Sequence, residues 1–405
     1  MSANLVRGMA LATGAGPTTS SPALAGSHRA NVIVVGAGAF GGWSALQLLR
    51  KGAKVLLLDA WGPGNSRASS GGETRVIRAT YGSERLHTQL TARALKLWQE
   101  NERRWNLKLF FRTGVLWMAG TEDSYERAAL PLLREAAVRF EKLPNADCAK
   151  RWPQINFEDV PWCIYEPDSG YLAARRGCEA VLNAFLKEGG EYRQASVTPG
   201  PIAGNRMQGI TATPGEILYA DYYVFACGPW LGRVFSFLAS IIIPTRQEVF
   251  FFGTAAGDLR FTDAQLPAWV DNGKHFTYGI PGNHWRGFKM ASHRLGPVID
   301  PTTMERRSSD EELAAARAYL RMRFPALAGA PLVETRVCQY ENSPDKSFIL
   351  DHHLEAENVW IVGGGSGHGF EHGPALGEIV CDAVLGLKAP PVELGLARLL
   401  KKSSV

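Results

Sequence analysis

The sequence predicts an α/β protein in which a Rossmann-type domain is interleaved with a second domain built on a mixed, largely antiparallel sheet. Three observations predict this fold class. Residues 31–59 have the pattern of a βαβ unit with a glycine-rich first turn, residues 246–295 that of short antiparallel strands punctuated by Gly and Asn, and residues 359–386 that of a strand, a glycine-rich turn and a helix. A chain of 405 residues has room for about two or three domains.

The βαβ unit has the clearest local pattern in the chain. Residues 31–35 form an apolar, β-branched run that is typical of a strand buried on both faces. The apolar spacing over residues 43–51 predicts a helix that Gly52 closes, and residues 54–59 predict a second strand.

The remaining elements follow from hydrophobic periodicity in chain order. Helices are predicted near residues 86–104, 123–140, 173–188, 309–323 and 374–386. Strands are predicted near residues 114–119, 206–213, 217–226, 248–252, 285–291 and 359–362.

Composition excludes several classes of function. Lys+Arg 44 against Asp+Glu 39 gives a net charge of +5, too small and too evenly spread an excess to indicate nucleic acid or a membrane surface as a partner. No apolar run reaches the roughly 18 residues needed to span a bilayer.

Residues 1–28 contain one basic residue, Arg7, and several helix-breaking residues, so we expect a flexible leader rather than an export signal. Six cysteines lie far apart without a CxxC pair, which suits reduced thiols in a cytoplasmic protein: Cys148, Cys163, Cys178, Cys227, Cys338 and Cys381.

The glycine-rich turn of the βαβ unit indicates a dinucleotide site. Gly36, Gly38 and Gly41 form the pattern G-x-G-x-x-G between a strand and a helix. The first two glycines permit a tight turn and a close approach of pyrophosphate, to which the helix N-terminus offers free N–H groups. Asp59, at the end of the second strand, is placed to accept hydrogen bonds from ribose hydroxyls. The alternative is a structural turn with a surface aspartate.

The arrangement of glycine turns favours FAD over NAD as the cofactor. A domain that binds NAD usually continues with further βα units, whereas residues 62–78 form a long polar loop suited to lie along an extended cofactor. Strand-then-glycine turns recur at residues 219–230, with Gly228, and at residues 359–370, with Gly367. We expect both turns to approach the same cofactor from its far side. On spacing alone, an NAD-linked dehydrogenase stays open as the alternative.

Six motifs, taken in order along the chain, carry a wider resemblance. They are Gly36-x-Gly38-x-x-Gly41 with Asp59, Glu73-Thr74-Arg75-Val-Ile-Arg78, Gly287-Phe-Lys289-Met-Ala-Ser-His293, Cys338-Gln-Tyr340, Asp345-x-x-Phe348-Ile-Leu-Asp351 and Gly367-His368-Gly369-Phe370. With these motifs the chain resembles the flavin-dependent amine oxidases of the monomeric sarcosine oxidase type, in the D-amino acid oxidase superfamily. The resemblance runs from residue 31 to about residue 385, nearly all of the expected folded chain.

The resemblance implies an FAD-binding domain of the glutathione-reductase-like type interleaved with a substrate domain. The ranges assigned are 1–30 for the leader, 31–113, 171–245 and 341–392 for the FAD-binding domain, 114–170 and 246–340 for the substrate domain, and 393–405 for a C-terminal tail. The implied reaction oxidises the C–N bond of a secondary amine or N-alkyl amino acid to an imine, with O2 reduced to H2O2. The implied partners are a small amine or amino acid and O2, and a monomer is expected.

The resemblance also assigns roles to single residues. Cys338 matches a cysteine that bonds covalently to the flavin, the alternative being a buried small hydrophobe. Lys289 matches a lysine near flavin N5 that stabilises the negative charge arising when O2 takes its first electron, the alternative being a solvated lysine on a strand. Arg78 matches an arginine that grips the substrate carboxylate. The other matches are Thr74 and Arg75 beside the flavin, Tyr278, His293 and Tyr340 in the substrate pocket, and Gly367 and His368 in a turn that faces flavin and substrate.

Two departures from the family pattern bear on the substrate. Glu371 stands where the family usually has a lysine that helps to hold the carboxylate, which disfavours a simple sarcosine-like substrate. We expect the glutamate either to favour a substrate with a second basic group or to pair with Arg78. Ser70, Gly71 and Gly72 stand where sarcosine oxidases carry histidines, and leave more room. Two other functions stay open: a dehydrogenase that uses another electron acceptor, and an FAD-binding protein that has lost catalysis.

Overall fold

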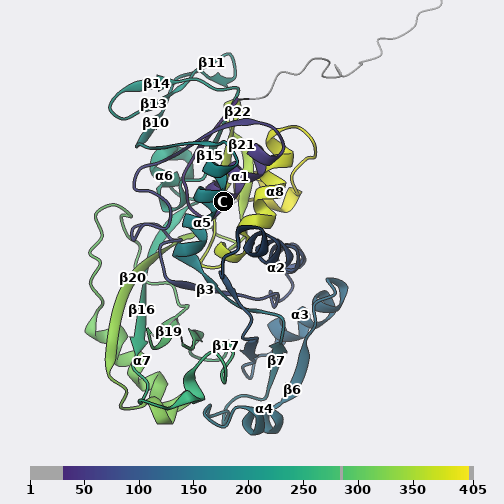
Figure 1. The fold of residues 1–405 in the computed structure, drawn as a ribbon, viewed down its shortest axis with the longest axis vertical. Helices are drawn as coiled ribbons and strands as arrows, with labels where there is room; N and C mark the ends of the chain where they lie inside the picture. The colour runs from purple at the N-terminus through teal and green to yellow at the C-terminus, as the bar shows by residue number, and fades with distance from the viewer. Residues whose placement is uncertain (1–30, 283–285, 401–405) are drawn as a thin grey trace, which may run out of the picture.

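The computed structural model describes residues 31–282 and 286–400. The leader predicted for residues 1–30 lies outside the described residues, as do Trp285 and the last five residues of the predicted tail. In Figure 1 the described chain divides into an upper part around one sheet and a lower part around a second sheet.

A six-stranded sheet forms the centre of the upper part. Its strands, in spatial order, are β21 (Ile349–His353), β22 (Ala356–Gly363), β15 (Tyr222–Phe225), β1 (Asn31–Val35), β2 (Lys54–Asp59) and β9 (Glu191–Gln194). The pairs β1–β2, β1–β15, β15–β22 and β2–β9 are parallel, and β21 pairs antiparallel with β22. The carboxyl ends of β1, β15 and β22 therefore meet at one edge of the sheet, which is where ligands of such folds bind.

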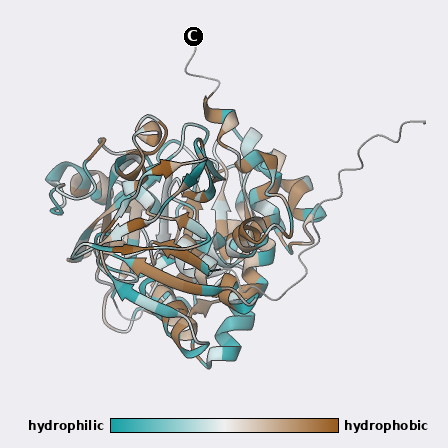
Figure 2. Cartoon of the chain, turned by 90° about the horizontal axis from the view of Figure 1, so that it is seen from above, coloured by the Kyte–Doolittle hydropathy of each residue, from teal (hydrophilic) through white to brown (hydrophobic). Residues whose placement is uncertain are grey.

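Both faces of this sheet are covered, which explains the unbroken apolar run in β1. Val32 and Val34 pack with the helices on one face, whereas Ile33 and Val35 pack into a separate cluster on the other. The helices on the first face are α1 (Ala39–Arg50), α2 (Arg85–Trp105), α5 (Ala174–Lys187) and α8 (Gly373–Val384). Figure 2 shows hydrophobic residues concentrated in the strands that cross the molecule and hydrophilic residues on the outer elements.

An eight-stranded sheet forms the lower part. Its order is β20 (Leu332–Asn342), β16 (Ile243–Phe252), β19 (Phe288–Ser292), β18 (Thr277–Ile280), β17 (Ala268–Asp271), β5 (Val115–Met118), β7 (Trp162–Glu166) and β6 (Glu141–Pro144). The β17–β5 pair is parallel and the other pairs are antiparallel. Helix α7 (Asp310–Arg323) packs against this sheet through Ala316, Tyr319 and Leu320. The predicted fold class, a Rossmann-type domain interleaved with a mixed, largely antiparallel sheet, is confirmed.

Smaller elements complete the fold. Three-stranded sheets are formed by β3 (Thr74–Ile77), β8 (Gly170–Ala173) and β4 (Phe110–Phe111), and by β10 (Val197–Pro199), β13 (Ile210–Ala212) and β14 (Glu216–Leu218); β11 (Ile202–Ala203) pairs with β12 (Arg206–Met207). The shorter helices are α3 (Ser124–Glu135), α4 (Asn145–Arg151), α6 (Leu231–Val234) and α9 (Ala397–Leu400).

Two predicted segments need correction. The region 62–78, predicted as a loop, contains β3, which pairs with β8. The helix predicted over residues 123–140 ends at Glu135, because Ala137 adopts the left-handed conformation with φ of +54°. Strand β3 matters for the site, because it carries Arg75.

The strands predicted over residues 206–213 and 217–226 are shorter than expected. They are broken into four pieces, β12 to β15, and Gly209 and Gly215 adopt positive φ between the first three of them. The domain boundaries stay a prediction.

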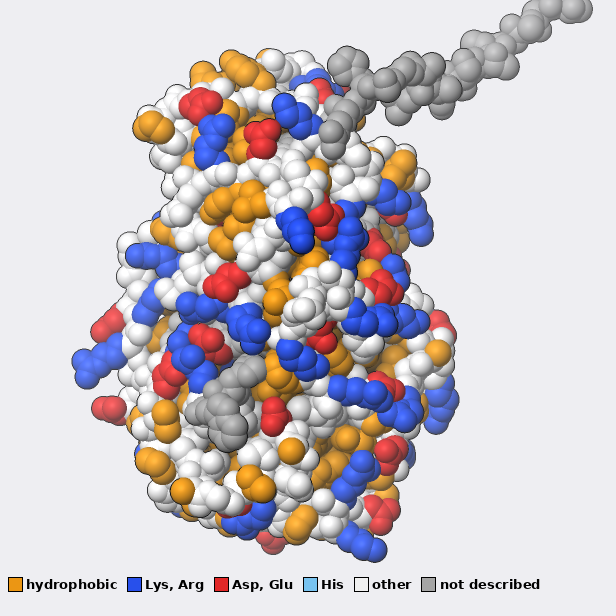
Figure 3. Space-filling model, in the orientation of Figure 1, with side chains coloured by type: hydrophobic (Ala, Val, Ile, Leu, Met, Phe, Trp, Pro, Cys, Tyr) orange, Lys and Arg blue, Asp and Glu red, His pale blue; other side chains and the backbone are white. Residues whose placement is uncertain are grey.

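The described residues contain no helix that is long and apolar enough to cross a membrane. They also contain no group of three or more His, Cys, Asp or Glu side chains arranged to hold a metal ion. All six cysteines are free. On the face that Figure 3 shows, basic and acidic side chains are interspersed.

A buried ion pair joins α7 to the eight-stranded sheet. The Arg323 guanidinium lies 2.9 Å from Asp271 Oδ2, and both side chains are at most 3% exposed. The Tyr319 hydroxyl donates to the same oxygen at 2.8 Å. Arg323 also pairs with Asp159 at 2.8 Å, but the Asp159 side chain is 55% exposed.

Asp271→Asn is expected to lower the free energy of unfolding by about 3 kcal/mol, because it leaves the buried guanidinium without its main counter-charge. Asp159→Asn is the matched control on the same arginine and should cost less than about 1 kcal/mol, because an exposed partner contributes little. Urea unfolding followed by tryptophan fluorescence measures both variants. Equal losses in the two would contradict a stabilising role for the buried pair.

Candidate active site

The glycine-rich turn joins β1 to α1 at the carboxyl edge of the six-stranded sheet. Gly36 has a φ of +109°, and a Cβ there would lie 2.2 Å from the carbonyl oxygen of Ala226. A Cβ on Gly41 would lie 1.8 Å from the carbonyl oxygen of Gly36. Both positions therefore require glycine, the first for the turn and the second for close packing of helix on strand. Because the turn ends at Gly38, α1 begins at Ala39, earlier than predicted.

Asp59 closes this turn from the end of β2. Its Oδ2 accepts a hydrogen bond from the Ala37 N–H at 2.8 Å, and its Oδ1 accepts from the N–H groups of Trp61 and Gly62 at 2.8 and 2.7 Å. The side chain also lines the cavity that begins here. Each carboxylate oxygen has lone pairs for further donors, so the predicted contact to ribose hydroxyls is compatible with these bonds.

A cavity of about 270 Å³ extends along the sheet edge from the glycine-rich turn. All three predicted glycine turns line it, through Gly38, Gly228 and Gly367. Tyr340 and Glu341 reach it from β20 of the other sheet. Segments far apart in the sequence thus converge on one cavity between the two sheets.

The cavity fits a dinucleotide cofactor. The N–H groups in the first turn of α1 have no intrahelical acceptor, and the helix dipole adds positive potential for phosphates. Two buried oxygen atoms of cavity residues, Ser69 Oγ and Glu341 Oε2, have no hydrogen-bond partner among the described residues. Hydroxyl groups and phosphate oxygens of a cofactor would supply such partners.

Four of the predicted site residues, Thr74, Arg75, Lys289 and Cys338, lie close together, and Arg75 lines the cavity. The buried Lys289 side chain reaches from β19 to β3, where its Nζ donates to the Thr74 carbonyl at 2.7 Å and lies 3.2 Å from Thr74 Oγ1. Arg75 Nη2 lies 3.5 Å from Cys338 Sγ. Burial, and then the Arg75 guanidinium, hold the pKa of Lys289 well below its usual range.

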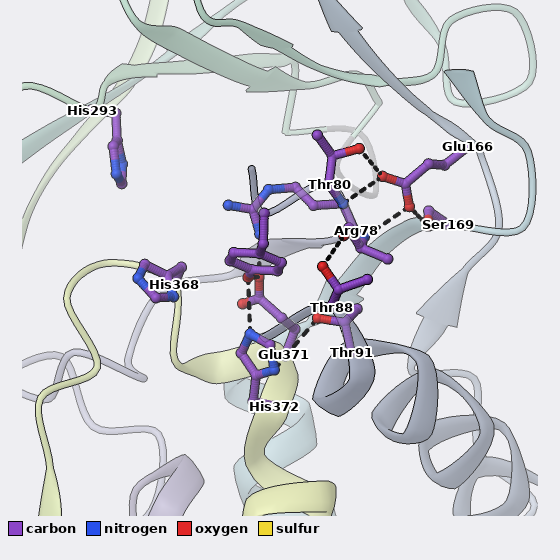
Figure 4. A network of polar contacts seen from close by, with 12 residues as sticks. Arg78, Thr80, Thr88, Thr91, Glu166, Ser169, His293, His368, Glu371 and His372 are labelled. Carbon is purple, nitrogen blue, oxygen red and sulfur yellow. Dashed lines mark hydrogen bonds and ion pairs between the residues drawn. The ribbon is translucent and has the colours of Figure 1, made fainter. Parts of the chain in front are cut away.

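Arg78 follows β3 and pairs with Glu371, as Figure 4 shows. Arg78 Nη1 lies 2.9 Å from Glu371 Oε1, and the two side chains are 12% and 4% exposed. The Tyr81 hydroxyl donates to the same Oε1 at 2.6 Å and lies 2.9 Å from His372 Nε2, from which it can accept. Burial raises the pKa of Glu371, although Arg78 opposes this shift. Of the two roles expected for Glu371, pairing with Arg78 is therefore the one observed.

Glu166 fixes the backbone directly after Arg78. Its Oε2 accepts from the Ala79 N–H at 2.8 Å and from the Ser169 hydroxyl at 2.7 Å. Its Oε1 accepts from the N–H and the hydroxyl of Thr80, at 2.9 and 2.7 Å (Figure 4). One buried carboxylate with four donors thus anchors the chain that carries the arginine.

The predicted pocket residues Tyr278, His293 and Tyr340 also lie together. His293 Nδ1 lies 3.2 Å from the Tyr340 hydroxyl, and the His293 and Tyr278 rings have centroids 6.4 Å apart. Burial, and then Arg78, lower the pKa of His293 to about 3. The imidazole is therefore neutral near neutral pH and can donate or accept a hydrogen bond without adding charge.

Gly367 and His368 form the turn beside this group. A Cβ on Gly367 would lie 2.5 Å from the Tyr340 ring, so the turn approaches that ring as closely as a glycine allows. His368 Nε2 lies 3.1 Å from the Lys346 carbonyl oxygen, while His368 Nδ1 is buried without a partner among the described residues. In Figure 4, His293 and His368 lie on one side of Arg78 and Glu166 lies on the other.

Sequence reasoning missed three residues that support the site. Tyr81 and His372 stand close in sequence to Arg78 and Glu371, and this proximity was the available signal. Glu166 is separated from the Ala79 amide that it binds by 87 positions, and no local pattern marks it.

Comparisons with known proteins agree with this geometry. Residues 31–383 match the sequence model of the DAO family, described as FAD dependent oxidoreductase. Monomeric sarcosine oxidase from Bacillus sp. (strain B-0618) is 32% identical over 371 residues, which cover 88% of this chain and 92% of that protein. N-methyl-L-tryptophan oxidase from Salmonella newport (strain SL254) is 29% identical over 383 residues, which cover 92% and 99%.

Solved structures share the fold. L-proline dehydrogenase from P. horikoshii superposes with a TM-score of 0.80 at 19% identity, covering 92% of this chain and 98% of that chain. The fructosamine oxidase Amadoriase II from Aspergillus fumigatus superposes with a TM-score of 0.75 at 19% identity, covering 91% and 89%. At this level of identity the likeness establishes the architecture alone.

Proposed function

The chain belongs to the DAO family of FAD-dependent oxidoreductases, and on that premise we propose that it oxidises the C–N bond of a secondary amine or N-alkyl amino acid to an imine, with O2 reduced to H2O2. The observation that carries the proposal is the group of Lys289, Arg75 and Cys338 at the cofactor cavity, which Arg75 and Tyr340 line; His293 contacts the Tyr340 hydroxyl. Bound FAD supplies the acceptor for the hydride on the carbon next to nitrogen. The two matched oxidases are named for sarcosine and N-methyl-L-tryptophan, which supports an N-methyl amine as substrate.

Arg78 and Glu371 set the charge of the substrate end of the site. Because they form an ion pair, the pocket lacks the excess positive charge that would strongly attract a free carboxylate. The guanidinium has five N–H donors, so donors remain after Nη1 contacts Glu371 and can orient a polar group of the substrate. The proposed site therefore accepts amines whose carboxylate is absent or masked more readily than sarcosine.

Lys289 supplies the cation beside the cofactor cavity. Its ammonium is held by the Thr74 carbonyl and hydroxyl, and the side chain is enclosed between β3 and β19. A fixed positive charge there stabilises negative charge on O2 as it takes its first electron, without reorganisation during the reaction. This role favours O2 over another electron acceptor.

Cys338 is proposed to bond covalently to the flavin. Its thiol is half-buried, and its Sγ lies 3.5 Å from Nη2 of Arg75, a residue that lines the cofactor cavity. After acid precipitation the yellow colour is expected to stay with the wild-type pellet and to move to the supernatant for Cys338→Ala. Cys178→Ala is the matched control, because Cys178 also lies near Arg75 but is buried. A wild-type pellet that loses all colour would contradict the covalent bond.

The reaction is tested on the purified holoprotein with a panel of N-methyl amino acids and N-methyl amines. Peroxidase-coupled detection and an oxygen electrode should show one H2O2 formed for each O2 consumed. If an amine bleaches the flavin but neither O2 uptake nor peroxide follows, the protein is a dehydrogenase with another acceptor. If no amine bleaches it, the protein has lost or changed the chemistry.

Two further expectations concern the protein in the cell. The dispersed free cysteines support a cytoplasmic location, and a monomer is expected. Gel filtration of the holoprotein and fractionation of expressing cells test these expectations.

A further inference from the structure

Glu341 is a buried carboxyl that the proposed reaction does not use. It follows Tyr340 in β20, is 8% exposed and lines the cofactor cavity. Its Oε2 has no hydrogen-bond partner among the described residues. A buried polar atom without a partner costs about 1–3 kcal/mol, so a partner from outside the chain is expected.

The Glu341 side chain reaches from the eight-stranded sheet to the edge of the six-stranded sheet where the carboxyl ends of β1, β15 and β22 meet. A Cβ built on Gly228 or Gly363 would lie 3.6 Å from Glu341 Oε2, and one on Gly365 would lie 2.9 Å from Oε1. Glu341 is thus inserted between the turns that follow β15 and β22. β15 is also the neighbour of β1, whose carboxyl end carries the Gly36 turn. The carboxyl group therefore lies at the edge of the sheet where the phosphates of a bound dinucleotide would be held.

The surroundings favour the neutral acid. Burial raises the pKa of Glu341 to about 8, although hydrogen bonds from the backbone of Gly365 and Gly364 oppose this shift. The ionisable groups around it are the Cys227 thiol in the adjacent turn, the Tyr340 phenol before it on β20, and, on the same cavity, the Asp59 carboxylate and the Arg75 guanidinium at the far end. An ionised carboxylate here would repel a pyrophosphate, whereas a protonated one can donate a hydrogen bond.

We propose that Glu341 is a cofactor-binding residue that acts as a neutral carboxylic acid and donates a hydrogen bond to an oxygen atom of the pyrophosphate–ribityl chain of FAD. Glu341 lines the cavity, and its unpartnered Oε2 is buried next to Gly228 and Gly363, at the turns that follow β15 and β22. Its removal should therefore weaken cofactor binding, whichever amine the enzyme oxidises.

The affinity for FAD is best measured in a Cys338→Ala background, where no covalent bond holds the flavin. With Glu341 present, the Kd from flavin fluorescence quenching should be nearly constant up to about pH 7, rise about twofold by pH 8 and about tenfold by pH 9, because only the protonated acid donates. Glu341→Gln keeps a donor that does not titrate, so its Kd should stay within about threefold of the parent at pH 7 and show no rise. Glu341→Leu, similar in size but without a donor, should bind about tenfold more weakly at pH 7.

A second readout uses the holoenzyme with Cys338 intact. The temperature at which flavin fluorescence appears during melting should fall between pH 7 and pH 9 more for the wild type than for Glu341→Gln. Glu334→Gln is the control, because it removes a carboxylate at the other end of the same strand, β20. Its melting temperature should fall between pH 7 and pH 9 by as much as that of the wild type. Identical pH profiles for wild type and Glu341→Gln, or full affinity in Glu341→Leu, would overturn the proposal.

Discussion

Replacing Lys289 with methionine is expected to slow the reaction of the reduced flavin with O2 by about 100-fold or more. Reduction of the flavin by the amine should change by less than about threefold, because the charge that Lys289 stabilises arises only on O2. The Lys289 side chain is buried and its Nζ donates to the Thr74 carbonyl, so its position is fixed before the reaction begins. Methionine has a similar length without the charge. Stopped-flow absorbance measures the two half-reactions separately.

Lys289 also predicts a pH dependence. Burial and Arg75 hold the pKa of this lysine well below its usual range. Because the cation is the useful form, reoxidation should be fast below that pKa and slow as the pH rises through it. Lys289→Arg is the matched control: it stays charged and should recover part of the rate without this pH dependence. Equal slowing of both half-reactions by methionine, or an unchanged pH profile, would contradict the assigned role.

Glu371→Gln is expected to lower the KM for N-methyl amino acids about tenfold, which corresponds to about 1.4 kcal/mol. The change removes the counter-charge of Arg78 and frees its guanidinium for a substrate carboxylate. This expected gain in binding energy for the substrate carboxylate is a modest part of the Coulomb attraction between two unit charges, which is about 4 kcal/mol at 4 Å near a protein surface. Steady-state kinetics with N-methyl amino acids, and with N-methyl amines that lack a carboxylate, measure the effect.

The amines without a carboxylate provide the internal control, because their KM should not fall. Glu378→Gln is the matched variant, since Glu378 pairs with the exposed Arg93 rather than with the arginine of the site. It should leave both KM values unchanged. If Glu371→Gln left the KM for the carboxylate substrates unchanged or raised it, Glu371 would not be what disfavours them.

The glycine-rich βαβ unit could be predicted because its information is local. The apolar run of β1, the turn glycines and the helix that follows lie within 29 residues, and each requirement is visible in the residue types. The convergence of Gly228 and Gly367 on the cavity of Gly36 could also be anticipated, because each follows a buried strand and parallel strands end at the same edge.

The contacts that support the substrate end could not be predicted in the same way. Arg78 and Glu371 are 293 positions apart, and the sequence left open whether they pair. Glu166 and Glu341 look like ordinary strand residues, and only the packing of the two sheets shows that one anchors backbone and the other faces the cavity. Long-range packing, rather than any local pattern, decides these contacts.

The central proposal, amine oxidation at a flavin, is tested most directly by an anaerobic absorbance titration of the purified protein. The titrants are sarcosine, N-methyl aromatic amino acids, proline analogues and diamines. Amine oxidation predicts that at least one of them bleaches the flavin absorbance and that O2 then restores it. A yellow protein whose absorbance none of these amines changes would contradict the proposed function.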